Sequence, residues 1–340
     1  MKGDPNKLQP RIEELSRYGL AFRGGANNTK PFRGVEMKTN RRDWLVASAA
    51  ATTSALAMLF QESKYYRDLR PKRSRIAILR ADQYSDKLDD LILNGIRLFN
   101  LNIRGKSVLL KPNLVEYIPG RPVNTDAQVI GASTEAFLRL GAASVVVSEG
   151  PGHHRDTDLL LYTTGLADQL KHRKISFVDL NRDELIKTKL QANYSGLRHL
   201  WLPRTILGSD FIVSMPKVKT HHWTGVTLSM KNMFGIVPGC RYGWPKNVLH
   251  WAGIHESILD ICATVRPHFV IADGIIAMEG DGPLNGPAKH LKTLLLSDDP
   301  VAADSTLMRY IGLQPDEVKH IREASRFIGN ASESMIANLT

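Results

Sequence analysis

Short apolar runs alternate with amphipathic stretches from Arg75 to the end of the chain. The apolar runs predict strands, and stretches with apolar positions three and four residues apart predict helices. Because strands and helices alternate, we expect an α/β fold with a mostly parallel open sheet and helices on both faces. The expected strands are 75–80, 107–110, 143–148, 176–180, 200–203, 211–215, 269–272 and 291–297, and the expected helices are 87–101, 126–140, 158–171, 254–265, 300–311 and 315–328.

The first part of the chain has a different pattern. Arg41 and Arg42 directly precede a mildly apolar, Ala-rich run that ends near the small-x-small triplet at 55–57. This is the layout of a twin-arginine export signal, although an amphipathic or buried helix behind a basic linker is an alternative. We expect translation to begin at Met37, and the twin-arginine export machinery to carry the protein to the periplasm or cell envelope. An uncleaved signal would tether it to the membrane.

These patterns divide the chain into four parts. Residues 1–36 are expected to be an extension, 37–60 the twin-arginine-type signal and 61–74 a polar linker. Residues 75–340 are expected to form a single α/β domain, with a cap or insertion at about 182–253.

The charge and the cysteine count exclude two classes of function. Residues 1–74 hold 15 Lys and Arg against 7 Asp and Glu, which leaves only 30 against 27 for residues 75–340. The nearly neutral globular part therefore argues against a broad nucleic-acid-binding surface. Two cysteines, Cys240 and Cys262, cannot ligate an iron–sulfur cluster or a four-thiolate zinc site, and either pair in a disulfide or stay free.

Polar residues follow the expected strands, where ligands of open parallel sheets bind. The chain order is Lys111 and Asn113, then Glu149 with His153 and His154, then Lys217, Lys219, His221 and His222, then Asp273 with Glu279 and Asp281. Because these residues would share one edge of the sheet, we expect lysines, carboxylates and imidazoles to converge there.

The segment 214–253 is the strongest site candidate because it is dense in lysine, histidine and tryptophan and poor in acidic residues. Lys217, Lys219 and His221 would share a face in an extended segment and form an anion site, to which Lys231 and Asn232 would add donors. The tryptophans Trp223, Trp244 and Trp251 are expected to form the core of the cap. Neither a GxxxxGK phosphate loop nor a GxGxxG motif at the start of a helix after the first strand is present.

The carboxylates allow several roles. Asp273, Glu279 and Asp281 could orient a catalytic histidine, act as general base or hold a divalent cation, although DG and GDGP are also turn sequences. Glu149 together with either His153 or His154 is a further candidate for metal binding. Asp304 is interpreted as structural.

Six segments together resemble the family known as domain of unknown function 362: 111–115, 124–132, 149–152, 214–235, 273–283 and 299–304. The likeness runs from about residue 75 to about 312, and the KVKTH and SMKNMFG segments are its most specific part. Many relatives join this domain to ferredoxin-type cysteine motifs, which implies redox work in those relatives. This chain lacks such a motif, so the resemblance implies no established reaction here.

The sequence thus predicts an exported enzyme that acts on a small carboxylate- or phosphate-bearing substrate by acid/base or metal-assisted chemistry. Lys111, Asn113, Lys217, Lys219, Lys231 and Asn232 would bind the substrate, and His221, His222, Glu149 and Asp273 would be catalytic. A divalent metal would be held by Glu149, Asp273 and Glu279. The alternatives are a non-catalytic anion- or cofactor-binding or maturation protein, and a redox subunit that uses a separate iron–sulfur partner.

Overall fold

One mixed β-sheet organises the described part of the protein. The computed structural model describes residues 68–152 and 156–340. The described residues form one compact unit. The predicted extension and signal, together with His153 and His154, lie outside the described residues.

The main sheet has the strand order β13-β1-β12-β10-β7-β2-β3-β4. The segment from β10 to β4 is parallel, whereas β12 runs antiparallel to both β10 and β1. The strands are β1 (Ser74–Arg80), β2 (Ser107–Pro112), β3 (Ser144–Glu149), β4 (Ser176–Asp179), β7 (Phe211–Met215), β10 (Phe269–Met278), β12 (Thr293–Ser297) and β13 (Ile336–Asn338). Short β8 (Lys217–His221) and β11 (Ala288–Lys289) pair with β10, and β9 (Gly225–Thr227) pairs with β8. The predicted α/β class with a mostly parallel sheet is confirmed.

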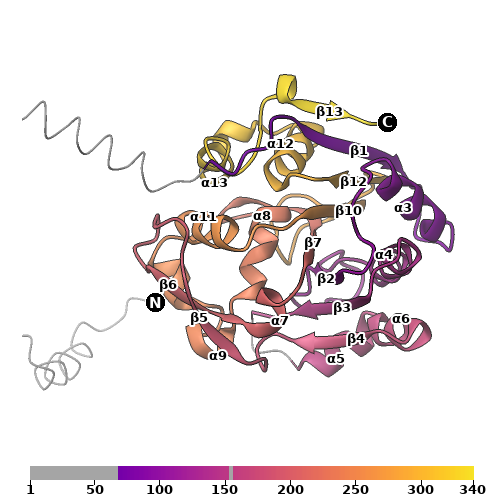
Figure 1. The fold of residues 1–340 in the computed structure, drawn as a ribbon, viewed down its shortest axis with the longest axis horizontal. Helices are drawn as coiled ribbons and strands as arrows, with labels where there is room; N and C mark the ends of the chain where they lie inside the picture. Colours follow the sequence, from indigo (N-terminus) through magenta and orange to yellow (C-terminus); the bar gives the residue numbers. More distant parts are fainter. Residues whose placement is uncertain (1–67, 153–155) are drawn as a thin grey trace, which may run out of the picture. The chain divides into compact units, whose positions relative to one another are not determined.

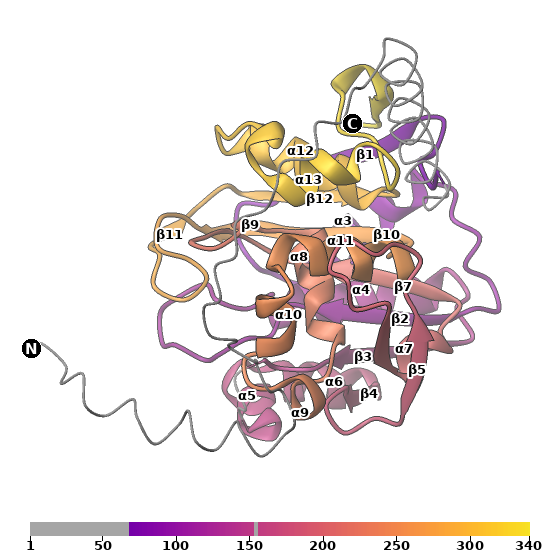
Figure 2. The same cartoon turned by 90° about the vertical axis from the view of Figure 1, so that its left-hand side faces the viewer.

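Helices cover both faces of this sheet, as Figures 1 and 2 show. α3 (Leu88–Arg97), α4 (Ala127–Arg139), α5 (Thr157–Thr163) and α6 (Leu166–Arg173) belong to one side, and α8 (Ser229–Asn232), α11 (Ile254–Thr264), α12 (Pro300–Tyr310) and α13 (Lys319–Ala324) to the other. The remaining short helices are α7 (Arg204–Leu207), α9 (Gly239–Tyr242) and α10 (Asn247–Trp251), with 3-10 turns at Met233–Ile236, Pro315–Glu317 and Glu333–Met335.

Alternation along the strands supplies a separate hydrophobic core to each face. In β2, Leu109 packs into the core under α11 and α12, while its neighbour Leu110 packs into the core under α3 and α4. Ile212 and Val213 divide in the same way in β7. This alternation is what a strand buried on both faces requires.

Three expectations about the elements need correction. The segment 182–253 is not one cap, because β7 is a central strand between β10 and β2; the β5–β6 hairpin (Leu185–Lys189 and His199–Pro203) forms a separate two-stranded sheet. The helix expected at 158–171 is interrupted at Gly165, whose φ of 73° no helix accommodates. The strand expected at 269–272 continues to Met278, so Asp273 lies inside it.

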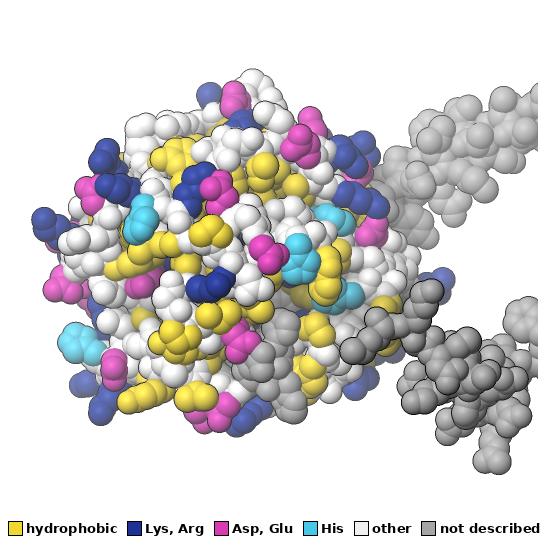
Figure 3. Space-filling view, turned by 180° about the vertical axis from the view of Figure 1, so that it is seen from behind, with side chains coloured by type: hydrophobic (Ala, Val, Ile, Leu, Met, Phe, Trp, Pro, Cys, Tyr) yellow, Lys and Arg dark blue, Asp and Glu magenta, His cyan; other side chains and the backbone are white. Residues whose placement is uncertain are grey.

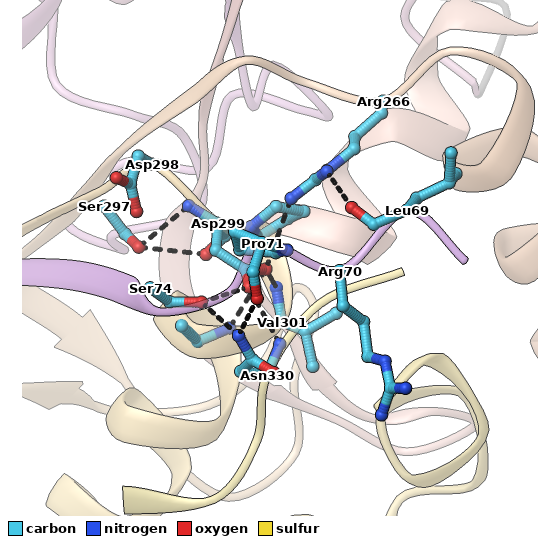
Figure 4. Close-up of polar contacts among 12 residues, drawn as sticks. Leu69, Arg70, Pro71, Ser74, Arg266, Ser297, Asp298, Asp299, Val301 and Asn330 are labelled. Atoms are coloured by element: carbon cyan, nitrogen blue, oxygen red, sulfur yellow. Dashed lines mark hydrogen bonds and ion pairs between the residues drawn. The ribbon is translucent and has the colours of Figure 1, made fainter. Parts of the chain in front are cut away.

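A buried carboxylate joins the two ends of the described chain, as Figure 4 shows. Asp299 caps α12 by accepting from the Val301 amide at 2.8 Å, and its other oxygen accepts from the Ser74 hydroxyl at 2.6 Å and the Asn330 amide at 2.8 Å. Nearby, the Leu69 amide donates to the Phe327 carbonyl at 2.7 Å. The end of the predicted linker is therefore part of the domain.

Candidate functional site

A cavity of about 220 Å³ lies where β2, β3 and the β7–β8 segment end. The loop after β2, the end of β3, strand β8, helices α8 and α10 and the loop 281–285 contribute to its wall. Its charged and aromatic lining residues are Glu149, Lys219, His221, His222, Trp223, Lys231, Phe234, Lys246, His250 and Asp281. The carboxyl edge of the parallel strands thus carries a pocket, as expected for an open α/β sheet.

A buried ion pair forms the base of this cavity. Lys111 Nζ lies 2.6 Å from Glu149 Oε2, and the two residues are 0% and 2% exposed. The same carboxylate accepts from the Leu114 amide at 3.1 Å and the Gly150 amide at 2.8 Å. Burial lowers the pKa of Lys111, and the Glu149 carboxylate opposes that shift. Glu149 is therefore fully engaged as the counter-ion of Lys111.

Gly235 allows this pair to lie against the backbone. A Cβ atom at position 235 would lie 2.6 Å from Lys111 Nζ and in steric overlap with the Glu149 carboxylate. Asn232 adds a further contact, because its Oδ1 accepts from Lys111 Nζ at 3.2 Å while its amide nitrogen donates to the Lys111 carbonyl at 3.0 Å. The SMKNMFG segment is thus shaped around Lys111.

Two more buried lysines reach the cavity and have only carbonyl partners among the described residues. Lys219 Nζ donates to the Val123 carbonyl at 2.8 Å, and Lys246 Nζ donates to the carbonyls of Phe234 and Gly235 at 3.0 and 3.1 Å. Burial lowers the pKa of Lys246 to about 7 and that of Lys219 well below its usual range, where neighbouring lysines add to the effect. Both sites therefore lack the negative charge that a buried ammonium requires.

Lys231 has a different environment. Its Nζ lies 4.6 Å from the centroid of the Phe234 ring and makes no hydrogen bond or ion pair within residues 68–152 and 156–340. Burial and the neighbouring Lys111 lower its pKa to about 8. Lys231 is the least constrained of the cavity lysines.

Three histidines line the cavity in two protonation patterns. His221 Nδ1 accepts from the Trp223 amide at 3.1 Å, which places the ring proton on Nε2, and burial lowers its pKa to about 2. His222 Nδ1 lies 2.7 Å from the Gly282 carbonyl, and His250 Nδ1 lies 3.1 Å from the Lys246 carbonyl. Since a carbonyl only accepts, these two rings carry their proton on Nδ1 and leave the Nε2 lone pair free. His221 is thus a permanent donor, whereas His222 and His250 are bases.

Asn113 presents an unsatisfied side chain to the same cavity. It is 7% exposed, and its Oδ1 has no hydrogen-bond partner in the described part of the chain. Leaving a buried amide oxygen unpaired costs about 1–3 kcal/mol. An acceptor without a partner in a cavity wall indicates that a ligand or water completes it.

Lys217 and Asp273 form a separate centre, contrary to the expectation that they join the histidines. They are cross-strand neighbours in β8 and β10, with Lys217 Nζ 2.5 Å from Asp273 Oδ2. The Tyr84 hydroxyl accepts from Lys217 Nζ at 2.9 Å and donates to Asp273 Oδ1 at 3.0 Å. Lys217 and Tyr84 border a second cavity of about 430 Å³, with Asp126 and His290. The proposed catalytic role of Asp273 beside His221 or His222 is therefore not supported by the geometry.

The predicted metal set is not assembled. Glu279 is at the surface and pairs with Lys289 at 2.5 Å, Asp273 is held by Lys217, and Glu149 is held by Lys111. Within the described ranges, no group of three or more His, Cys, Asp and Glu side chains is arranged to hold a metal ion. The predicted metal site of Glu149 with His153 or His154 involves residues outside the described ranges.

Several residues differ in role from the sequence interpretation. Trp223 and Trp251 are 57% and 81% exposed, so they are not a cap core. Figure 3 shows histidine and hydrophobic side chains side by side on one face of the molecule, and both residue types also occur in the cavity wall. Cys240 is exposed and Cys262 buried, and both are free thiols. Among the helices described, none has the length and apolar content needed to cross a bilayer.

Sequence reasoning gave no site role to Lys246, His250 or Asp304. Asp304 is buried in α12 and accepts from the Ser229 amide at 2.7 Å, the Ser229 hydroxyl at 2.6 Å and the Met230 amide at 3.0 Å. It thereby fixes the start of α8, two residues before Lys231. Its interpretation as structural agrees with these contacts. The only sequence signal for Lys246 and His250 was their place in the lysine- and histidine-rich segment 214–253.

Fold and site define an α/β domain with a cation-rich cavity at the carboxyl ends of its parallel strands. The chain belongs to the family described as Domain of unknown function (DUF362), whose model matches residues 108–309 and so confirms the resemblance. The thylakoid-associated protein sll1697 of Synechocystis sp. is 27% identical over 218 residues, which are 62% of this chain and 64% of that relative. The chain therefore matches slightly less than two thirds of the length of this relative.

Two solved structures are similar at a low level. A Thermotoga maritima protein, solved as a structural genomics target, gives a TM-score of 0.43 at 15% identity, over 73% of this chain and 61% of that one. The lactate racemase apoprotein from Thermoanaerobacterium thermosaccharolyticum gives a TM-score of 0.42 at 14% identity, over 76% of this chain and 58% of that one. Similarity at this level has no bearing on the function of the present chain.

Proposed function

We propose that the protein is an enzyme that binds a small carboxylate- or phosphate-bearing metabolite in the 220 Å³ cavity and acts on it by proton transfer. The observation that carries the proposal is the absence of a carboxylate partner for Lys219, Lys231 and Lys246 in the described residues. Buried cations without counter-ions favour an anionic ligand, which would supply the missing charge.

The remaining groups divide between binding and chemistry. The Nε2–H of His221 is a fixed donor suited to a ligand oxygen atom, and the unpaired Oδ1 of Asn113 is an acceptor suited to a hydroxyl group of the ligand. His222 has a free Nε2 lone pair, is oriented by the Gly282 carbonyl and lies stacked on His221, with 5.0 Å between the ring centroids. An imidazole that presents Nε2 in a fixed orientation at a cationic site is suited to act as general base, because nearby ammonium groups stabilise the negative charge that develops on the substrate.

Charge-matched variants test the binding step. Lys231→Gln removes one cation from the cavity, and Lys171→Gln removes one from the exposed surface of α6. Because a hydrogen bond to a charged group contributes about 1.5–3 kcal/mol, we expect Lys231→Gln to weaken phosphate or carboxylate binding about 10- to 100-fold. Isothermal titration of the full chain with inorganic phosphate, citrate and 2-oxoglutarate measures this. Equal affinity of the two variants for these anions would show that the cavity is not the binding site.

Solvent exchange tests the chemical step. The metabolites that bind would be incubated with the protein in deuterium oxide, and loss of a carbon-bound proton would be followed by NMR. We expect exchange with the unmodified chain and none with His222→Asn. Binding without exchange or any turnover would favour the alternative of a non-catalytic binding or maturation protein.

We also propose export by the twin-arginine route, on the sequence of residues 37–60 alone. The N-terminus of the mature protein in its native host, determined by mass spectrometry, tests it. A mature chain that begins at residue 1 or 2 would contradict export.

A further inference from the structure

Lys231 differs from the other lysines of the cavity in having nothing to hold its amine. Lys111 has a carboxylate, and Lys219 and Lys246 have backbone carbonyls within 2.8–3.2 Å. Lys231 Nζ has no such acceptor among the described residues and lies over the Phe234 ring. An ammonium carries three N–H donors, so a site without acceptors favours the neutral amine, which is the nucleophilic form.

The charged surroundings act in the same direction. Lys111 repels a charge on Lys231, and Glu149, already paired with Lys111, opposes this only in part. Lys231 in turn lowers the pKa values of Lys219, His221, Lys246 and His320, so these four groups take up a proton less readily than Lys231 does. A lysine desolvated beside other cationic groups is the arrangement that activates an amine for attack on a carbonyl carbon.

The backbone around Lys231 is fixed, which positions the amine. Asp304 holds Ser229 and Met230 on one side. On the other side, the Asn232 amide donates to the Lys111 carbonyl at 3.0 Å and to the Ser214 hydroxyl at 3.1 Å. Only the side chain of Lys231 is left free to approach a ligand in the cavity. Catalytic sites need such a rigid backbone, because it positions the reactive side chain.

We propose that Lys231 is a nucleophile that forms an imine with a carbonyl-bearing anion, an aldehyde or ketone acid or phosphate. The neutral amine adds to the carbonyl carbon, and the oxygen leaves as water. Overall, the ammonium form of Lys231 and the carbonyl give an iminium and water, so that a C=N bond replaces C=O and two ammonium protons leave with the oxygen. This inference rests on the proposed function, since the carboxylate or phosphate of the ligand would bind the remaining cations.

Reductive trapping tests the proposal. The full chain would be incubated with glyoxylate or pyruvate and sodium cyanoborohydride, followed by peptide mass spectrometry. We expect one predominant adduct, on Lys231, and its loss in Lys231→Arg, which keeps the charge but cannot form the imine. Lys171, exposed on α6, is the internal control. Adducts spread equally over surface lysines, or none on Lys231, would overturn the proposal.

Competitive acetylation tests the amine without any assumed substrate. With trace acetic anhydride over a pH series, Lys231 should acylate with a midpoint near pH 8, against about 10.4 for a lysine in a model peptide, so that at pH 8 its neutral fraction is about 100-fold larger than in such a peptide. A midpoint equal to that of Lys171 would also overturn the proposal.

Phosphate titration of the same samples separates the two claims. If phosphate binds but Lys231 behaves as an ordinary surface lysine, only the nucleophile is refuted. If phosphate, citrate and 2-oxoglutarate all fail to bind, the proposed function itself is wrong.

Discussion

Neutralising Glu149 gives the sharpest test of the charge arrangement under the cavity. Lys111 is 0% exposed and has Glu149 as its counter-ion at 2.6 Å. In Glu149→Gln, one oxygen replaces two, while Lys111 and the amides of Leu114 and Gly150 still require acceptors. Removing one partner of a buried pair costs about 3–5 kcal/mol because it leaves an uncompensated charge. At about 2 °C per kcal/mol for a unit of this size, Tm should fall by at least about 6 °C.

A double-mutant cycle distinguishes loss of the pair from loss of packing. Lys111→Met removes the other charge, and the combination of Lys111→Met with Glu149→Gln leaves neither. Because replacing both charges of a buried pair is often nearly neutral, the double variant should be more stable than the sum of the single losses predicts. Urea unfolding of the four proteins by circular dichroism measures the free energies. Additivity within about 0.5 kcal/mol would refute the reasoning.

Three further predictions concern the supports and the pH dependence of the site. Gly235→Ala should lower stability by about 1–3 kcal/mol in urea unfolding, because its Cβ would overlap the Lys111–Glu149 pair; an unchanged midpoint would show that the pair can move aside. Burial raises the pKa of Asp304 to about 7, so its contribution to stability is full below pH 4 and is lost as pH rises to about 7. The stability difference between the unmodified chain and Asp304→Asn should follow this course in unfolding at pH 4 to 8, and a constant difference would contradict the assignment. Phosphate affinity should fall about tenfold from pH 7 to 9 as Lys231, with a pKa of about 8, loses its charge; calorimetry showing a flat profile would exclude that lysine from binding.

The sequence pattern predicted the central strands because they are buried on both faces and read as continuous apolar runs. It could not predict β8, whose KVKTH sequence is half polar and is a strand only because Lys217 pairs in register with Asp273 of β10. The same pairing explains the error at Asp273. Asp-Gly after an apolar run is typical of a turn, yet the strand continues because Lys217 and Tyr84 satisfy the buried carboxylate.

The site was predicted in outline for a similar reason. Alternation in β8 predicted that Lys217, Lys219 and His221 share one face, and all three side chains are buried. Local periodicity could not show that the Lys219 amine donates to the Val123 carbonyl while Lys217 borders a different cavity. The backbone of Lys246 has a φ of 71°, and the residue lies in an irregular segment without the hydrophobic periodicity of a helix or strand. Residues whose position depends on long-range contacts were therefore the ones missed.

The described residues supply less negative charge around the cavity than its lysines require. Glu149 neutralises Lys111, and Asp281, the other acidic residue in the wall, is exposed at the surface. Among the described residues, Lys219, Lys231 and Lys246 then share a deficit of negative charge that an anionic ligand would correct. The ligand-free domain should consequently gain Tm with phosphate or a carboxylate beyond the effect of ionic strength, which equal concentrations of sodium chloride would control.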